Sequence, residues 1–485
     1  MAMTALVKDR SLVIFTALTA VSSILAMSFS LDGIRQFLWF LYLLQLVGVG
    51  HVLLRSLDRW MVLLSPSFIC VSYVLLNNFL GSIAFSFERV HHAPDYYAYQ
   101  KWNYLHLSVV FTLACNWAVV LSLRQALRGG IARVVQASRP RISSLEFFLI
   151  LAFSGIAIAF FSFVDLNLSF AGGDGSFSIF PKTLAALVLA VALHKRGSRW
   201  RFLCYLLLIS YFASFSAEDK RQAIFLFLPI IMIEALNLPS FKLSLRFFTI
   251  SALAFVSVVF LILMMSIYRG YGQYNPEGFL DSARYVDDYI LEDRFLEYLL
   301  ANTEVNYLFF HSHQALEYIL EEPSQVLWGS TFAKILYIPA PRYLYPDKPK
   351  SIIERYTGIH SPEFRALGGS WASGIYAEFF WNFHFLGLIP LYLLFLMLNK
   401  GYFWLAKYVR EGMDLQFVFP IYAYQQLMEL FRGTGLDQFV TYCLVSAVIF
   451  FAFLYPMLVL ILFATRGRSR KLIPAAIGST VSHIV

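Results

Sequence analysis

The sequence predicts an all-α membrane protein, a polytopic helical bundle of about twelve transmembrane helices with one large external loop. Of its 485 residues, 59% are hydrophobic and only 14% are charged, whereas a soluble domain carries about 25% charged residues. The apolar residues gather in long runs, and the basic residues lie mostly in short segments between these runs. This pattern excludes a soluble globular domain, a disordered chain and a nucleic-acid-binding module.

A helix that crosses a bilayer needs about 20 mostly apolar residues. The runs that approach this length are 11–30, 34–54, 60–86, 105–123, 145–165, 178–194, 202–216, 222–238, 247–267, 374–398, 414–430 and 437–464. The first run follows two basic residues, as a signal peptide would. A second run begins shortly after it with no small-residue cleavage site between them, so we expect a retained first helix.

The distribution of Lys and Arg predicts the orientation. More than half of the 38 basic residues fall in segments that face inward if the N-terminus is cytoplasmic, and the short outward segments hold far fewer. By the positive-inside rule both termini are cytoplasmic. The predicted organisation is helices one to nine in 1–267, a large periplasmic loop in 268–373, and helices ten to twelve with a cytoplasmic tail in 374–485.

The large loop contains two segments with apolar residues at helical spacing. We expect Asp281–Leu300 and Asn306–Glu322 to form helices that lie along the membrane surface or cap the bundle. His311 and His313 stand two positions apart and so point in different directions. The four cysteines are scattered singly, without metal-ligand or disulfide spacing. We therefore expect no metal site and no cofactor.

A proline-rich stretch in the loop, 338–350, holds four prolines and forbids a helix. The result is a stiff ribbon that carries Arg342, Lys348 and Lys350. A fixed cation loses little entropy when it binds an anion, and a guanidinium matches phosphate oxygens in a bidentate way. The alternative is a proline-rich loop whose basic groups are merely solvated.

A run rich in Gly and Ser leads from the loop into the tenth hydrophobic run, with Ser370 or Ser373 as possible N-caps. Glu378 lies one turn inside that helix, and Asn382 follows on the same face. An ionisable group in a span is costly and faces a partner or a water-filled cavity. Glu378 is thus a carboxylate facing an outer vestibule or a structural carboxylate paired with an Arg.

Two more arginines sit at the outer ends of predicted spans. Arg221 and Arg432 map to the same membrane face as Arg342 in the loop. A cluster of arginines at this face is what the diphosphate group of a membrane lipid requires. Each could instead be an interfacial anchor whose head group reaches the water.

These features together resemble the bacterial O-antigen polymerases, the Wzy-type oligosaccharide repeat-unit polymerases. The similar positions are Pro341-Arg342, Pro346-Asp347-Lys348-Pro349, the helix with Glu378, Phe383 and Gly387, and the outer-face Arg221 and Arg432. In detail the resemblance covers roughly 328–390, and the twelve-span plan covers the rest. The acidic residues Glu218 and Asp219 before Arg221 depart from the pattern.

The resemblance implies a metal-independent glycosyltransferase with a fold like that of the GT-C enzymes. Such polymerases act in lipopolysaccharide and other polysaccharide biosynthesis at the periplasmic face of the bacterial inner membrane. They transfer a growing glycan from undecaprenyl diphosphate to a lipid-linked oligosaccharide repeat unit. The implied partners are that lipid-linked oligosaccharide and membrane lipids, with a regulator of chain length as a further candidate, and no nucleic acid.

The resemblance also assigns roles to residues. Arg342 and Arg221 would grip the diphosphate, assisted by Arg432 and Lys348, since arginines stabilise a departing diphosphate as a metal would. The acceptor hydroxyl needs a general base. Glu378 is the first candidate for the base or for positioning the acceptor, and Asp347 and His360 come next. Arg342 is the strongest candidate among the catalytic cations.

Other functions stay open on the sequence alone. An O-antigen ligase or another polyprenyl-phosphate-dependent GT-C enzyme would keep the chemistry, although many of the latter place acidic residues in a sizeable first external loop, which here is only about 31–33. A flippase for lipid-linked oligosaccharides would show paired halves and polar groups at the midplane. A structural scaffold is the remaining class. Tyr343, Tyr345, Trp371 and Trp381 could stack on sugars, but aromatic residues make up 18% of the chain and so mark no particular site.

Overall fold

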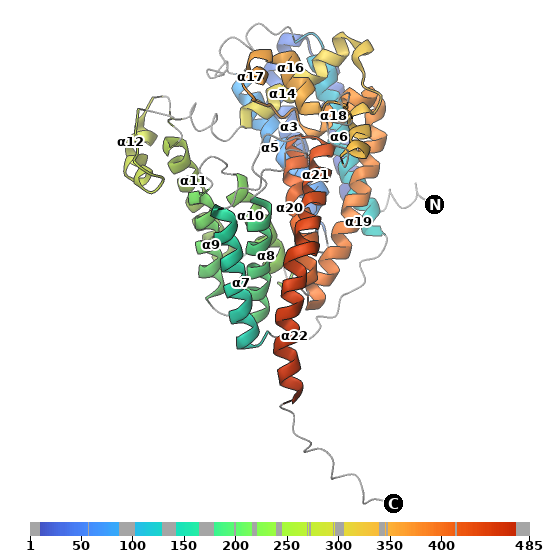
Figure 1. Cartoon of the computed structure of the whole chain (residues 1–485). Helices are drawn as coiled ribbons and strands as arrows, with labels where there is room; N and C mark the ends of the chain where they lie inside the picture. The colour runs from blue at the N-terminus through green and yellow to red at the C-terminus, as the bar shows by residue number, and fades with distance from the viewer. Residues whose placement is uncertain are drawn as a thin grey trace, which may run out of the picture.

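The chain folds as helices joined by short connections (Figure 1). In this computed structural model the described residues are 10–56, 58–86, 102–128, 142–163, 179–197, 200–215, 221–238, 245–268, 270, 273–293, 295, 305–338, 345, 348–412 and 415–471. Over these ranges the regular structure is helical, with no strand. The prediction of an all-helical membrane protein is confirmed at this level.

Seven helical segments among the described residues are long and apolar enough to cross a membrane. Five are single helices: α2 (Arg10–Ser28), α3 (Leu31–Leu54), α5 (Pro66–Ser86), α6 (Leu105–Arg128) and α7 (Ser144–Phe163). Two are composite: α18 (Ile375–Phe383) with α19 (Leu388–Gly412), and α21 (Leu436–Ile449) with α22 (Tyr455–Lys471).

The other five predicted runs also contain helices. These are α8 (Ile179–Arg196), α9 (Arg201–Phe215), α10 (Arg221–Ala235), α11 (Leu245–Tyr268) and α20 (Val418–Arg432). They are short, carry more charge or are described only in part, so the count of twelve spans stays a prediction. The run 60–86 is interrupted, because α4 (Arg59–Leu63) ends before α5 begins.

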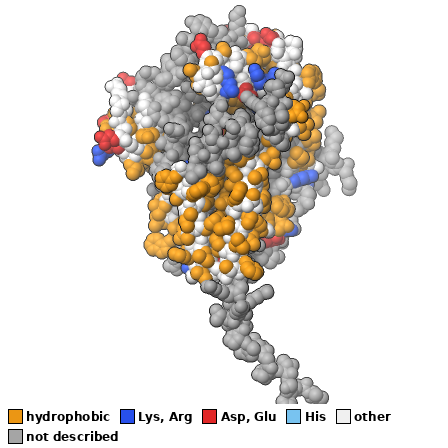
Figure 2. All heavy atoms as spheres, in the orientation of Figure 1, with side chains coloured by type: hydrophobic (Ala, Val, Ile, Leu, Met, Phe, Trp, Pro, Cys, Tyr) orange, Lys and Arg blue, Asp and Glu red, His pale blue; other side chains and the backbone are white. Residues whose placement is uncertain are grey.

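The helices form two neighbouring groups (Figure 1). Helices α7 to α11 stand together on one side, and α2 to α6 pack with α19 on the other. Helix α20 contacts α5, α8, α10 and α21, so it lies where the two groups meet. One hydrophobic core runs from α2 to α22 through both groups. Hydrophobic side chains cover the middle of the face shown in Figure 2, and charged side chains gather toward its upper end.

Buried amide and hydroxyl groups cross-link the larger group. Asn116 in α6 donates to Gln45 in α3 over 2.8 Å, and Tyr376 in α18 donates to Asn116 over 2.8 Å. In an apolar surrounding such hydrogen bonds join helices, because the polar groups have no water to bind instead. The chain of bonds fixes the start of α18 against α3 and α6.

The large loop folds back over one end of this group. Its helix α14 (Val305–Glu321) packs on α5, α6 and α18, so the prediction that 306–322 forms a capping helix is confirmed. Gly81 in α5 makes this possible, because a Cβ there would lie 2.3 Å from the Cβ of Phe309. The sequence placed a longer helix over 281–300. Within the described residues of this range, 281–293 and 295, the structure has η2 (Asp281–Tyr285) and α12 (Val286–Leu291), packed on α11, and α12 ends at Leu291.

Short elements complete the cap above α18. They are η3 (Pro323–Gln325), α15 (Ser330–Ala333), η4 (Lys334–Tyr337), α16 (Ile352–His360) and α17 (Pro362–Ala366). Helix α16 begins at a capping box in which Ser351 and Glu354 each accept the other's backbone N–H. This satisfies two donors at the start of a helix that is too short to be stable alone.

Two predicted runs bend inside their length. Run 374–398 breaks at η5 (His384–Gly387), where His384 has φ +53° and a Cβ on Gly387 would lie 2.5 Å from the carbonyl oxygen of Phe379. Run 437–464 contains a π-turn, η7 (Phe450–Leu454), between α21 and α22. A π-turn inserts one extra residue and bends a helix locally.

Candidate functional site

The candidate site is built around the turn between α20 and α21, Arg432-Gly433-Thr434-Gly435. Gly433 ends α20 in the left-handed region at φ +92°, and Gly435 precedes α21 at φ +107°. Both conformations are costly for any residue with a side chain, which explains the two glycines. The turn leaves Arg432 as the last residue of α20.

The turn lies directly on the start of α18. The N–H of Gly374 donates to the carbonyl oxygen of Arg432 over 3.1 Å. A Cβ on Gly433 would lie 2.2 Å from the nitrogen of Gly374, and Gly374 itself has φ +85°. Three glycines therefore let two backbones touch at the point where Arg432 leaves α20.

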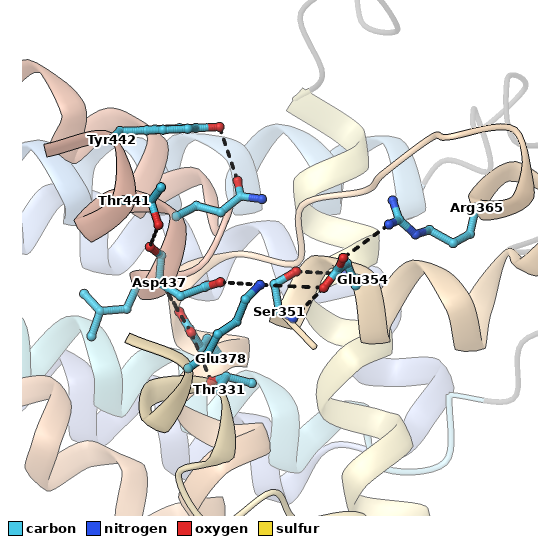
Figure 3. Close-up of polar contacts among 11 residues, drawn as sticks. Thr331, Ser351, Glu354, Arg365, Glu378, Asp437, Thr441 and Tyr442 are labelled. Carbon is cyan, nitrogen blue, oxygen red and sulfur yellow. Dashed lines mark hydrogen bonds and ion pairs between the residues drawn. The ribbon is translucent and has the colours of Figure 1, made fainter. Parts of the chain in front are cut away.

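Glu378 holds the other side of the turn (Figure 3). Its carboxylate accepts the N–H of Leu436, the first residue of α21, over 3.0 and 3.3 Å, and the hydroxyl of Thr331 over 3.2 Å. The side chain of Glu378 is fully buried. An anion at a helix N-terminus compensates the unpaired N–H groups there. Asn382 donates to Thr331 over 2.7 Å, so the predicted shared face of Glu378 and Asn382 is confirmed.

An ion-pair network continues from this point toward the surface (Figure 3). Lys334 in η4 lies 2.8 Å from Asp437 in α21 and 3.6 Å from Glu354 in α16. Glu354 in turn lies 3.4 Å from Arg365 in α17. Asp437 is 2% exposed, and removing its partner would leave an uncompensated buried charge. The network ties the cap elements to α21.

Arg432 has a partly exposed guanidinium, with 19% of its side chain accessible. Its Nη1 lies 3.8 Å from the carboxylate of Glu429, one turn earlier in α20. This ion pair is long. The backbone of Arg432 is held by Gly374, so two helices set the point at which its side chain leaves α20.

His311 connects Arg432 with His360. It stacks on Trp371 with 4.8 Å between ring centroids, and its Nδ1 lies 3.3 Å from the carbonyl oxygen of Ala372. The pKa of His311 is lowered to about 3, mainly by burial, with smaller contributions from His360 and from the positive charge of Arg432. His311 thus lies within electrostatic reach of both groups.

His360 ends α16 among aromatic rings. Its ring lies 4.6 Å from that of Tyr356 and 5.6 Å from that of Tyr318. Burial lowers the pKa of His360 to about 4, so the imidazole is neutral at pH 7 and able to accept a proton. Its Nε2 is buried and accepts no hydrogen bond within the described part of the chain.

His313 serves the packing of α14. Its Nε2 lies 2.9 Å from the hydroxyl of Tyr42, and its Nδ1 lies 2.8 Å from that of Ser108. Both ring nitrogens therefore have partners. The prediction that His311 and His313 point in different directions is confirmed.

The structure places only some of the predicted site residues. Glu378 and Arg432 meet at the α20–α21 turn, and His360 lies near them through His311. Lys348 is half-buried in the segment before α16. Arg342 and Asp347 lie outside the described residues, and Arg221 begins α10 with a side chain that is likewise outside them. Among described residues no group of three His, Cys, Asp or Glu side chains is placed to hold a metal.

One local prediction is wrong, and several residues were missed. Neither Ser370 nor Ser373 caps α18, because its N-cap is Gly374, whose backbone is turned to meet Arg432. The sequence reasoning also missed Lys334, Asp437 and Thr331. Their partners lie tens of residues away, and no local pattern marks such a pairing. The Ser351–Glu354 capping box, in contrast, was readable as a serine followed three residues later by a glutamate.

The comparisons with known proteins add no relative. No family model matches the chain, and no curated protein or solved structure matches it. The function is therefore argued from the site alone.

Proposed function

We propose that the protein is a glycosyltransferase that polymerises lipid-linked oligosaccharides, as the resemblance to the Wzy-type polymerases implies. The observation that supports it most is the fixed Arg432. This arginine is partly exposed at the capped end of a membrane bundle, and it is held by backbone contacts with α18 beside a neutral histidine cluster. A fixed guanidinium at such a place suits a lipid diphosphate.

The proposed reaction needs no metal. A hydroxyl of the acceptor repeat unit attacks the anomeric carbon of the donor glycan. The carbon–oxygen bond to undecaprenyl diphosphate breaks, and the diphosphate leaves with the electron pair. Arg432, with Arg342, Arg221 and Lys348, would stabilise the charge that develops on the leaving group. A general base would take the hydroxyl proton.

The geometry gives different roles to the residues that are candidates for the general base. Glu378 is fully buried and occupied by Leu436 and Thr331, so we assign it to positioning the α20–α21 turn and thereby Arg432. The Nε2 of His360 has no hydrogen-bond partner within the described residues, so His360 stays the candidate for the base among them. Asp347 stays the alternative base.

The proposal includes a topology. Twelve spans in a GT-C-like arrangement, cytoplasmic termini and a cap on the periplasmic side of a bacterial inner membrane would put Arg432 at the outer leaflet. There the diphosphate of a lipid carrier stands at the depth of the head groups, with its polyprenyl chain among lipid-facing helices. The position of Arg432 at one end of a buried helix fits this depth.

The test uses purified full-length protein in detergent with undecaprenyl-diphosphate-linked repeat units, and products are read on a gel. A ladder spaced by one repeat unit, lost in Arg342→Ala and Arg432→Ala but kept in Arg284→Ala, supports the polymerase. Arg284 is a matched control because it is 82% exposed in the same loop as Arg342, and among the described residues its ion pair is with Asp281 in η2. A single transfer to another acceptor without a ladder would point to a ligase. No transfer to any acceptor would overturn the enzyme.

A further inference from the structure

Three rings stack on one another from the surface of the cap inward. Phe364 in α17 is the outermost and stays 38% exposed. Its ring centroid lies 5.4 Å from that of Trp371 at an interplanar angle of 30°, and Trp371 lies 4.8 Å from His311 at 27°. The pair of Trp371 and His311 is stacked, and Phe364 packs on Trp371 at a tilt, which are both favourable arrangements of aromatic rings. The row therefore runs from solvent to His311, whose pKa is affected by Arg432.

The backbone fixes this row in place. The N–H of Trp371 donates to the buried hydroxyl of Thr357 over 2.9 Å. Gly369 fits against the tip of the Phe364 ring, where a Cβ would lie 2.4 Å from its Cζ, and the N–H of Gly369 donates to the carbonyl oxygen of Phe364 over 2.9 Å. The rings therefore keep their stacking without a ligand.

Charged planar groups border the outermost ring. Arg365 donates toward Glu354 over 3.4 Å and toward the carbonyl oxygen of Gly369 over 3.4 Å. Glu363, next to Phe364 in α17, is exposed. An exposed aromatic ring beside carboxylate and guanidinium groups is complementary to a sugar, whose ring carbons present an apolar face and whose edge presents hydroxyls.

We propose that Phe364 and Trp371 form a binding site for one pyranose ring of the lipid-linked oligosaccharide. The identity of the glycan rests on the proposed function, whereas the stacking site follows from the ring geometry. The axial C–H groups of the sugar lie on the exposed ring of Phe364, and its hydroxyls bond to the neighbouring Arg365.

The row gives the sugar site a position relative to the diphosphate site. His311, at the inner end of the row, contacts the carbonyl oxygen of Ala372, two residues before the Gly374 that binds Arg432, and Phe364 lies at the outer end (Figure 1 shows α16 and α17 over α14). Because His311 is buried, the glycan contacts the row at Phe364. The site therefore binds a sugar of the chain at some distance from the reacting carbon, and it holds the glycan rather than the lipid.

Saturation-transfer NMR on the full chain in detergent micelles tests the site. The probes are free disaccharides of hexoses and of N-acetylhexosamines, without lipid or diphosphate. Phe364→Leu keeps an apolar side chain but loses the flat ring, and Phe364→Tyr keeps the ring. Leu367→Ala is the matched control, because Leu367 is 86% exposed one residue beyond α17 and takes no part in the stack.

The expected result is saturation transfer to axial ring protons of at least one probe. Binding should weaken about tenfold in Phe364→Leu and stay unchanged in Phe364→Tyr and Leu367→Ala. Equal binding by the wild type and Phe364→Leu, or no binding of any probe by the wild type, overturns the site. So does equal weakening by Leu367→Ala, which would indicate a general apolar contact. Because the probes carry no diphosphate, failure here leaves the ladder assay intact, and loss of the ladder leaves sugar binding intact.

Discussion

Glu378 illustrates how a buried carboxyl group can serve a site that it does not touch. Its carboxylate accepts the N–H of Leu436 and the hydroxyl of Thr331, and Asn382 supports Thr331 from the same helix face. A carboxylate with these partners lowers the cost of ending a loop and starting a helix inside a protein. At this position the carboxyl group therefore holds the backbone at the start of α21 in place.

Substitution of Glu378 separates its hydrogen bonds from its shape. Glu378→Gln keeps an oxygen that accepts from Leu436, so the fold should persist, while transfer should fall because an NH2 group replaces one of the two oxygens that accept from Leu436 and Thr331. Glu378→Ala leaves two buried donors without an acceptor and should lower the free energy of unfolding by about 2 kcal/mol. Thermal unfolding in detergent and the ladder assay measure the two effects. Full transfer by a stable Glu378→Gln would contradict the positioning role.

The buried histidines of α14 predict acid sensitivity. Burial lowers the pKa of His311 and of His313 from 6.5 to about 3. Between pH 3 and 6.5 the unfolded chain therefore binds more protons than the folded one, so stability rises with pH through this window and falls on acidification. His311→Phe, which keeps a ring against Trp371, should flatten the slope. The melting temperature between pH 4 and 7 checks this, and an unchanged slope would contradict it.

At the scale of single residues, the sequence indicated which residues belong to the site better than it indicated which residues they contact. Glu378 and Arg432 were singled out because each is a charged group within or at the end of an apolar run, and His360 because it lies in the same loop as Arg342. Lys334 and Asp437 were not, since each resembles an ordinary loop or helix-end charge until the fold brings them within 2.8 Å. Long-range pairing of this kind has no local signature.

The α20–α21 turn is the element on which the account depends. It is fixed by Gly374 from α18, by Glu378 through Leu436, and by Lys334 through Asp437. Three contacts from two elements, α18 and η4, thus determine one turn of four residues. Because several contacts fix this turn, its backbone can keep two residues with positive φ.

A Cβ at this turn should be intolerable. Gly433→Ala would bring a methyl group 2.2 Å from the nitrogen of Gly374 at φ +92°, so we expect loss of transfer and a melting temperature lower by several degrees. Gly401→Ala in α19 is the control, since nothing lies within 4 Å of its Cβ position. A Gly433→Ala protein with wild-type stability and activity would show that the close approach is unnecessary.

Elements were predicted well where they are long and apolar and less well where the chain bends. Each of the twelve hydrophobic runs contains a helix. The break at His384 and the π-turn at Phe450–Leu454 escaped prediction because the sequence stays apolar through both. The capping position of α14 was predicted as one of two options, and the small Gly81 facing Phe309 is what the packing required.

At the scale of the whole molecule, we predict that the cap and the cytoplasmic ends of the helices lie on opposite sides of the membrane. With the native cysteines replaced, Leu367→Cys should react with an impermeant maleimide in intact cells. Lys407→Cys, whose native side chain is 49% exposed near the end of α19, should react only after permeabilisation. The reverse pattern would invert the topology and remove the cap from the periplasm.

The central claim is that the junction of α18, α20 and α21 binds a lipid diphosphate through Arg432. The most direct measurement is binding of undecaprenyl diphosphate to the full chain in nanodiscs by ³¹P NMR, with undecaprenol as competitor. We predict binding that undecaprenol does not displace, weakened about tenfold by Arg432→Lys despite the retained charge and unaffected by Arg284→Ala. Equal binding by the wild type, Arg432→Lys and a folded Arg432→Ala would contradict the claim.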